Sequence, residues 1–149
     1  MLRFAALAVV AMSFASEPGP RIFVYAQRDT PARRWTPVTC DGSAAAEIRQ
    51  GVYFAVNVSA GRHTLAIAGG VPLTVEARAG ADSFVRLDWH HEVGRAPVAT
   101  LSGVDARRAR KEMMFLSYAE AKRIHSAAVP KTDPRPPEDL RFGTREDRQ

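Results

Sequence analysis

The sequence predicts a mainly β fold: a small antiparallel β-sandwich of about seven to eight strands, followed by one or two C-terminal helices. From Arg21 to Val104, apolar residues recur at every second position, as they do in strands with one buried face. Turn pairs such as Asp41-Gly42 separate these runs, and short strands at such spacing are typical of a sandwich or small barrel. The residues that follow favour helix. We therefore expect the sandwich over 16–104 and a helical extension over 105–128.

The individual strands follow from this alternation. In the run from Val52 to Val58, every second residue is aromatic or β-branched. The run from Ile22 to Ala26 is rich in strand-forming residues on both faces, which indicates a strand buried on both sides or one that pairs near an edge. The other strands are expected around Val38 and Cys40, Leu65 and Ile67, Val71 to Val75, Val85 to Trp89, and Val98 to Ser102.

A small group of residues is expected to shape turns and to carry no chemistry: Asp41, Gly42, Gly51, Gly61 and His63. The glycines can adopt a positive φ at little steric cost, and Asp-Gly between extended runs is a strong hairpin signal. His63 shares a strand face with Leu65 and Ile67. We therefore interpret it as a hydrogen-bonded structural histidine near a turn.

The helical extension has two possible arrangements. Asp105 is a good N-cap for the strong helix formers that follow it. Ser117-Tyr-Ala-Glu120 is a capping-box pattern. Either one helix runs from about Ala106 to Ala127, or a first helix ends near Met114 and a second begins at Ser117.

The C-terminal residues are expected to form a tail. Four prolines prevent further helix there: Pro130, Pro134, Pro136 and Pro137. The segment is also balanced in charge, with five basic and five acidic residues. We therefore expect residues 129–149 to be disordered.

The first 15 residues have the pattern of a signal peptide. Arg3 provides a positive start, Phe4 to Phe14 is an almost uninterrupted apolar run, and small residues precede a cleavage point after Ala15. As a helix the apolar run spans about 17 Å, against a hydrocarbon core of about 30 Å, so no membrane-spanning helix is expected. We expect an exported chain, periplasmic or extracellular, that is soluble after cleavage.

The composition limits the class of protein and locates its positive charge. The chain has 149 residues, with 21 Lys+Arg against 16 Asp+Glu and a formal net charge of +5. These proportions exclude a mostly disordered polymer, a collagen-like chain and a multi-domain enzyme. The excess charge comes mainly from one basic cluster: Arg107, Arg108, Arg110 and Lys111. Such a cluster can bind an anionic partner such as a phospholipid surface or nucleic acid. More often, basic residues of this kind form the solvent-exposed face of a helix. Export argues against nucleic acid as the partner.

No residue pattern indicates a catalytic centre, a metal site or a cofactor. Cys40 is the only cysteine, so it forms no intramolecular disulfide. It lies two residues after Val38 and so on the same face of the expected strand, which indicates a buried, unreactive thiol. His90 and His91 are adjacent on an expected strand, so they point to opposite faces and cannot readily bind one metal together. We expect neither a metal nor a cofactor.

Several of these motifs together resemble a known family. They are the aromatic-containing run Ile22-Phe-Val-Tyr25, the Asp41-Gly42 turn, Gly51 with Tyr53-Phe54, and Gly61 with His63-Thr64. The run from Arg21 to Trp89 resembles the DUF2846 family, exported bacterial domains of unknown function, with Ala60 where that family usually has proline. The resemblance implies a small β-sandwich in an exported protein and brings no catalytic residue with it.

Two functions are compatible with these observations. The first is a non-catalytic envelope module whose sandwich binds a protein or cell-wall partner. The second is a periplasmic enzyme with a site between the sandwich and the C-terminal helices. We favour the first, because the second requires a constellation of residues that no sequence motif reports.

Overall fold

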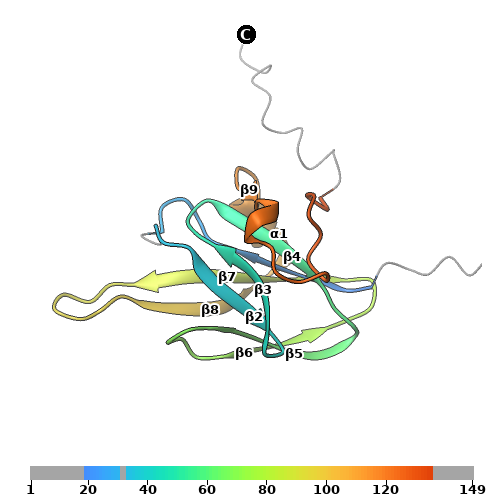
Figure 1. Cartoon of the computed structure of the whole chain (residues 1–149), viewed down its shortest axis with the longest axis horizontal. Helices are drawn as coiled ribbons and strands as arrows, with labels where there is room; N and C mark the ends of the chain where they lie inside the picture. Colours follow the sequence, from blue (N-terminus) through green and yellow to red (C-terminus); the bar gives the residue numbers. More distant parts are fainter. Residues whose placement is uncertain (1–18, 31–32, 136–149) are drawn as a thin grey trace, which may run out of the picture.

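The computed structural model describes residues 19–30 and 33–135, and in this part of the chain nine strands form two stacked sheets (Figure 1). The expected signal peptide, residues 1–15, lies outside the described residues. The strands are β1 (Arg21–Tyr25), β2 (Thr36–Cys40), β3 (Ser43–Ile48), β4 (Val52–Asn57), β5 (Gly61–Ile67), β6 (Leu73–Ala77), β7 (Asp82–His90), β8 (Val98–Val104) and β9 (Ser117–Tyr118). The helix α1 (Ala106–Met113) and the short 3-10 helix η1 (Ala121–Arg123) complete the fold.

The sheet order confirms the predicted sandwich. One sheet has five strands in the order β8-β7-β1-β4-β9, and the other has four in the order β3-β2-β5-β6. Five of the seven strand pairs are antiparallel, whereas β1 pairs with β7 and β4 with β9 in parallel. These two parallel pairs join strands that are distant in sequence, because parallel neighbours require a long crossover connection.

The Asp41-Gly42 pair forms the tight hairpin between β2 and β3. Cys40 pairs with Ser43, so the loop has two residues. Their φ angles are 52° for Asp41 and 81° for Gly42. Two positive φ angles match the twist of a two-residue hairpin, and Asp and Gly are among the residues that tolerate them.

The main core lies between the two sheets. From the five-stranded sheet it takes Ile22, Val24 and Phe54, all fully buried. From the four-stranded sheet it takes Ile48 and Leu65, which are equally buried. These residues occupy alternating strand positions, as the period-two pattern predicts.

A third layer covers the outer face of the five-stranded sheet. Ala109 and Met113 of α1, with Leu116 after it, pack against Phe23 and Tyr53. Figure 1 shows α1 on the far side of this sheet from β2 and β3. β1 is therefore a central strand buried on both sides, which agrees with the first of the two interpretations of the run from Ile22 to Ala26.

The C-terminal region differs from the predicted helical extension. α1 ends at Met113, and Asp105 caps its start by accepting a hydrogen bond from the Arg108 backbone N–H at 3.0 Å. Ser117 begins β9 and not a second helix. Its backbone N–H donates to the Gly51 carbonyl at 2.9 Å, because the open edge of β4 provides acceptors that compete with the capping box. From there to residue 135, where the described part of the chain ends, only the three residues of η1 are helical.

The predicted disordered tail, residues 129–149, is also corrected for its first seven residues. Val129 is only 2% exposed, and the Pro130 carbonyl accepts a hydrogen bond from the Tyr118 hydroxyl at 2.6 Å. The Asp133 carboxylate accepts one from the Tyr53 hydroxyl. Proline prevents helix here, but it does not prevent an extended segment from packing on the sheet. The remainder of the predicted tail, 136–149, lies outside the described residues.

Candidate functional site

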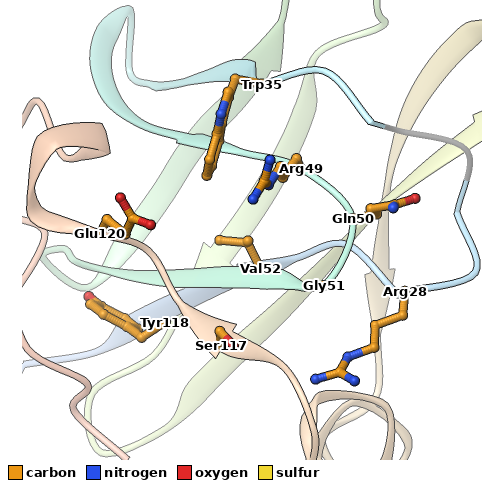
Figure 2. A pocket seen from close by; sticks show the side chains of 9 residues that line it. All are labelled: Arg28, Trp35, Arg49, Gln50, Gly51, Val52, Ser117, Tyr118 and Glu120. Carbon is orange, nitrogen blue, oxygen red and sulfur yellow. The ribbon is translucent and has the colours of Figure 1, made fainter.

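A cleft of about 440 Å³ lies where the C-terminal segment meets the turn between β3 and β4 (Figure 2). The chain thus brings together residues from four separate places in the sequence. The lining residues are Arg28, Trp35, Arg49, Gln50, Gly51, Val52, Ser117, Tyr118 and Glu120.

Backbone pairing forms one wall of the cleft. Val52 of β4 is aligned with Ser117 of β9 in the parallel pair. Gly51 has a φ of 79° and its N–H donates to the Ala26 carbonyl at 2.9 Å, which holds the turn against the end of β1. A Cβ at Gly51 would lie 3.3 Å from Cγ of Arg28. Glycine is therefore required here both for its backbone angle and for the close approach of Arg28.

Arginine side chains stack on Trp35 at one side of the cleft. The guanidinium carbon of Arg49 lies 4.6 Å from the ring centroid, and that of Arg123 lies 4.1 Å from it. Arg123 also forms an ion pair with Glu47 at 3.6 Å. The ring thus orients Arg49 by cation–π attraction, and it is not a free aromatic platform for a sugar or a base.

The cleft is positively charged. Arg28 donates to the Phe115 carbonyl at 2.5 Å, a bond that leaves its other N–H groups for a ligand. The one carboxylate in the lining, Glu120, is paired with Lys122 at 3.0 Å. The hydrogen bond from Lys122 holds the pKa of Glu120 below its ordinary value.

The cleft can bind an anionic group, but it has no apparatus for nucleophilic catalysis. The Ser117 hydroxyl and the Gln50 amide add neutral hydrogen-bonding groups to the lining. No histidine or cysteine is among the described residues that line it. Ser117 therefore lacks the adjacent base that a serine nucleophile requires.

The basic cluster predicted from the sequence does not line this cleft. Arg107, Arg108, Arg110 and Lys111 all lie on α1, with exposed side chains. Arg108 is paired with Glu112 at 2.8 Å, and the guanidinium carbon of Arg110 lies 5.7 Å from the ring centroid of Phe84.

Under α1, the structure assembles a polar cluster that the sequence analysis missed. Glu112 accepts hydrogen bonds from the Tyr25 hydroxyl at 2.5 Å and from Arg86 at 3.0 Å. Burial acts to raise the pKa of Glu112, but the hydrogen bonds from Tyr25, Arg108 and Arg86 outweigh it and lower the pKa. Arg86 is also bonded to Asp88 at 2.9 Å. Each charge already has a partner, so this cluster orients α1 on the sheet and leaves no group free for a ligand.

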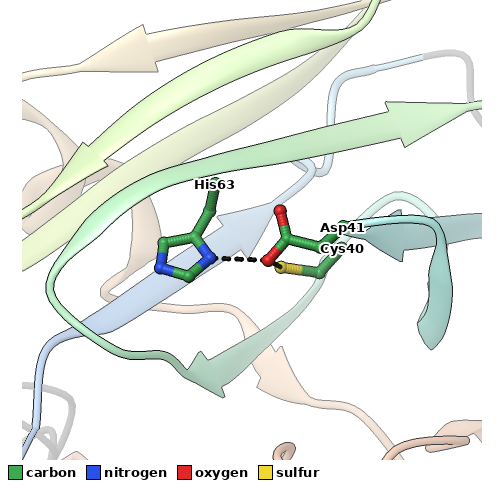
Figure 3. Close-up of side chains that lie close together, drawn as sticks. All are labelled: Cys40, Asp41 and His63. Carbon is green, nitrogen blue, oxygen red and sulfur yellow. Dashed lines mark hydrogen bonds and ion pairs between the residues drawn. The ribbon is translucent and has the colours of Figure 1, made fainter.

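A second close group contains Cys40, Asp41 and His63, whose potential ligand atoms lie within 4.8 Å of one another (Figure 3). His63 Nδ1 lies 2.6 Å from Asp41 Oδ2, and Nε2 lies 2.7 Å from the Ser59 carbonyl oxygen. Both ring nitrogens therefore face acceptors, which favours the doubly protonated imidazolium. The hydrogen bond with Asp41 is the main cause that raises the pKa of His63.

The other two members of this group have partners that point to the same structural role. Asp41 Oδ1 accepts the Thr64 N–H at 2.8 Å. Burial raises the pKa of the Cys40 thiol to about 11, and Asp41 adds to that effect. A metal would have to displace protons from both His63 and Cys40. The geometry fits an ion pair that fastens the β2–β3 hairpin to β5, in line with the structural role expected for Asp41 and His63.

The remaining candidate turn residues are glycines with the backbone angles anticipated for them. Gly61 has a φ of 126° at the start of β5, and Gly51 has the angle described above. Asp82 is bonded to Arg21 at 3.0 Å. This ion pair joins β7 to β1, and neither residue lines the cleft.

Comparison with known proteins adds no assignment. The chain matches no family model, no curated protein and no solved structure. Within the described residues, no helix has the length and apolar character needed to cross a membrane.

Proposed function

We propose that this chain is a non-catalytic, exported envelope module that binds a protein or cell-wall partner through an anionic group held in the cleft. The observation that carries the proposal is the presence of two oriented arginines, Arg28 and Arg49, in one cleft of about 440 Å³. The export part of the proposal is based on the signal-peptide pattern of residues 1–15.

The arrangement suits a carboxylate or a phosphate. A guanidinium presents N–H groups in a planar fork that matches two oxygens of such a group. Arg49 is oriented by Trp35, and Arg28 by its bond to the Phe115 carbonyl. Because both side chains are held in place before binding, less conformational entropy is lost when a ligand arrives.

The alternative is an enzyme with a site between the sandwich and the C-terminal segment, and the cleft does lie there. Its chemistry would have to use Ser117, Tyr118 or Glu120. The Tyr118 hydroxyl is bonded to the Pro130 carbonyl, and Glu120 to Lys122. None of these groups forms a hydrogen-bonded pair of nucleophile and base, so binding without catalysis is the better explanation.

In-cell photo-crosslinking tests the proposal. A photoreactive amino acid replaces Gln50 in the cleft and, in a matched control, replaces Arg62, an exposed residue of β5 near the Asp41-Gly42 end of the sandwich. We expect the probe at position 50 to form a discrete adduct with a protein or with peptidoglycan, and the probe at position 62 to form none. The double variant R28Q/R49Q should abolish the adduct.

Three outcomes would count against the proposal. Equal labelling from positions 50 and 62 would mean that the cleft is not the binding site. An adduct that persists in R28Q/R49Q would mean that the arginines do not recognise the partner. Turnover of a substrate by the purified chain, abolished by Ser117→Ala, would favour the enzyme.

A further inference from the structure

The outer side of α1 combines positive charge with exposed apolar side chains. Phe115 is 61% exposed and Met114 is 37% exposed, and both directly follow the helix. Three exposed basic residues precede them on α1: Arg107, Arg110 and Lys111. We name these five residues the α1 patch.

Helical geometry explains why these side chains are grouped. Arg107, Lys111 and Met114 are separated by four and three residues, so they lie along one side of α1. Ala109 and Met113 are buried against the sheet on the opposite side. Phe115 follows the last turn, where its carbonyl is held by Arg28.

The charge of the α1 patch is not neutralised within the described fold. Arg107 and Lys111 make no ion pair with another described residue. The one carboxylate of α1, Glu112, is directed to Tyr25 and Arg86, and its side chain is only 13% exposed. The outer surface of the helix is therefore cationic.

We propose that the α1 patch docks on an anionic phospholipid surface. Basic side chains are attracted to anionic headgroups, and an exposed aromatic residue beside them can enter the interfacial region. The helix is the outermost layer of the fold, so it can approach a flat surface without a complementary partner shape.

The size of the patch favours a lipid surface over an acidic protein. A stable protein–protein interface buries about 800 Å² on each partner and involves about 20 to 30 residues a side. The α1 patch has five residues, none of which lines the cleft described above. A membrane can bind so small a patch reversibly, because its headgroups rearrange around each cation.

Vesicle co-sedimentation tests this inference. The processed chain, which starts at Ser16, is mixed at low ionic strength with vesicles of phosphatidylcholine alone or with an equal share of phosphatidylglycerol. We expect binding to the anionic vesicles only, and release by added salt. Because each basic residue near such a surface contributes about fivefold in affinity, R107Q/K111Q should weaken binding by about 25-fold. F115A should weaken it several-fold.

Matched variants distinguish the patch from general charge and apolarity. R62Q/R78Q removes two exposed cations elsewhere, and V71A removes a side chain that is 78% exposed in another region. Both should bind like the parent. All exchanged side chains are exposed, and equal thermal unfolding of the variants verifies that the fold is retained.

Several results would overturn the inference. One is equal binding to neutral and anionic vesicles, and another is equal weakening by R62Q/R78Q. A chain that binds polyglutamate but no vesicle would identify an acidic protein as the partner. Release by inorganic phosphate beyond the effect of chloride at equal ionic strength would indicate a free anion site and not a lipid surface.

Discussion

The guanidinium carbon of Arg135 lies 4.2 Å from the ring centroid of Tyr53. The same guanidinium donates to the Met113 carbonyl at 3.0 Å and to the Leu116 carbonyl at 3.3 Å. Carbonyls at the end of a helix have no partner within the helix, so a cation that binds there stabilises the end of α1. Arg135 thus joins the C-terminal segment, α1 and β4, although no sequence motif connects these elements.

Replacing Arg135 by Gln should lower the free energy of unfolding by about 1–3 kcal/mol, because the side chain is only 12% exposed and its loss removes the donor to the Leu116 carbonyl and one of two donors to the Met113 carbonyl. Urea denaturation at neutral pH measures the change. Arg95, whose ion pair with Glu92 is exposed, provides the control, and Arg95→Gln should have almost no effect. If both variants unfold at the parent midpoint, the C-terminal segment does not stabilise the fold.

The packing of α1 predicts a sharp difference between two neighbouring residues. Leu116 is 6% exposed, so Leu116→Ala should cost about 2–5 kcal/mol through lost burial and the cavity that remains. Met114 is 37% exposed, and Met114→Ala should change stability by no more than about 0.5 kcal/mol. The denaturation midpoints of the two variants check this expectation. Equal midpoints would mean that α1 is not docked on the sheet.

The ion pair between His63 and Asp41 should make stability depend on pH. The hydrogen bond with Asp41 raises the pKa of His63 in the folded state, so the stabilisation is fully present below the unfolded value of about 6.5 and is lost as the pH rises through the folded value. The pKa of Asp41 is lowered, mainly by its hydrogen bond with His63. Its contribution is therefore lost at the acidic end, as the pH falls below the unfolded value of 3.8.

The difference in unfolding free energy between the parent and His63→Gln should thus be largest between about pH 4 and 6.5 and decrease on both sides. Urea midpoints measured across this range reveal the profile. His91→Gln removes an exposed histidine and should track the parent at every pH. A constant difference for His63→Gln would show that the contact acts without its charges.

Metal chelation should leave the melting temperature unchanged. A metal that is part of a fold contributes to its stability, so a chelator lowers the melting temperature of a protein that depends on one. Here both ring nitrogens of His63 and both carboxylate oxygens of Asp41 are already hydrogen-bonded. Thermal unfolding with EDTA and with added zinc tests this. A rise with zinc that His63→Gln abolishes would identify Cys40, Asp41 and His63 as a metal site.

Export predicts a defined N-terminus. If the apolar run before Ser16 is a signal peptide, the chain released by its native host should begin at or within a few residues of Ser16. Intact-mass spectrometry of the recovered protein measures this directly. Recovery of the uncleaved chain from the membrane fraction would contradict it.

The sequence by itself determined the features that depend on neighbouring residues. The alternation from Val52 to Val58 predicts a strand, because successive side chains point to opposite faces. The Asp41-Gly42 pair predicts a tight hairpin, because both residues tolerate a positive φ. Asp105 predicts a helix start, because its side chain can accept a backbone N–H three residues later.

The tertiary structure decided the features that depend on residues far apart in the chain. Ser117 has the local signal of a helix start, but it pairs with β4 because an open strand edge lies beside it. The cleft is lined by residues as distant in sequence as Arg28, Arg49 and Glu120 only because β9 pairs with the edge of β4. Asp41 and His63 are 22 residues apart and meet across two paired strands. Local propensities act over a few residues, whereas a binding site requires contacts that only the complete packing of the sheets provides.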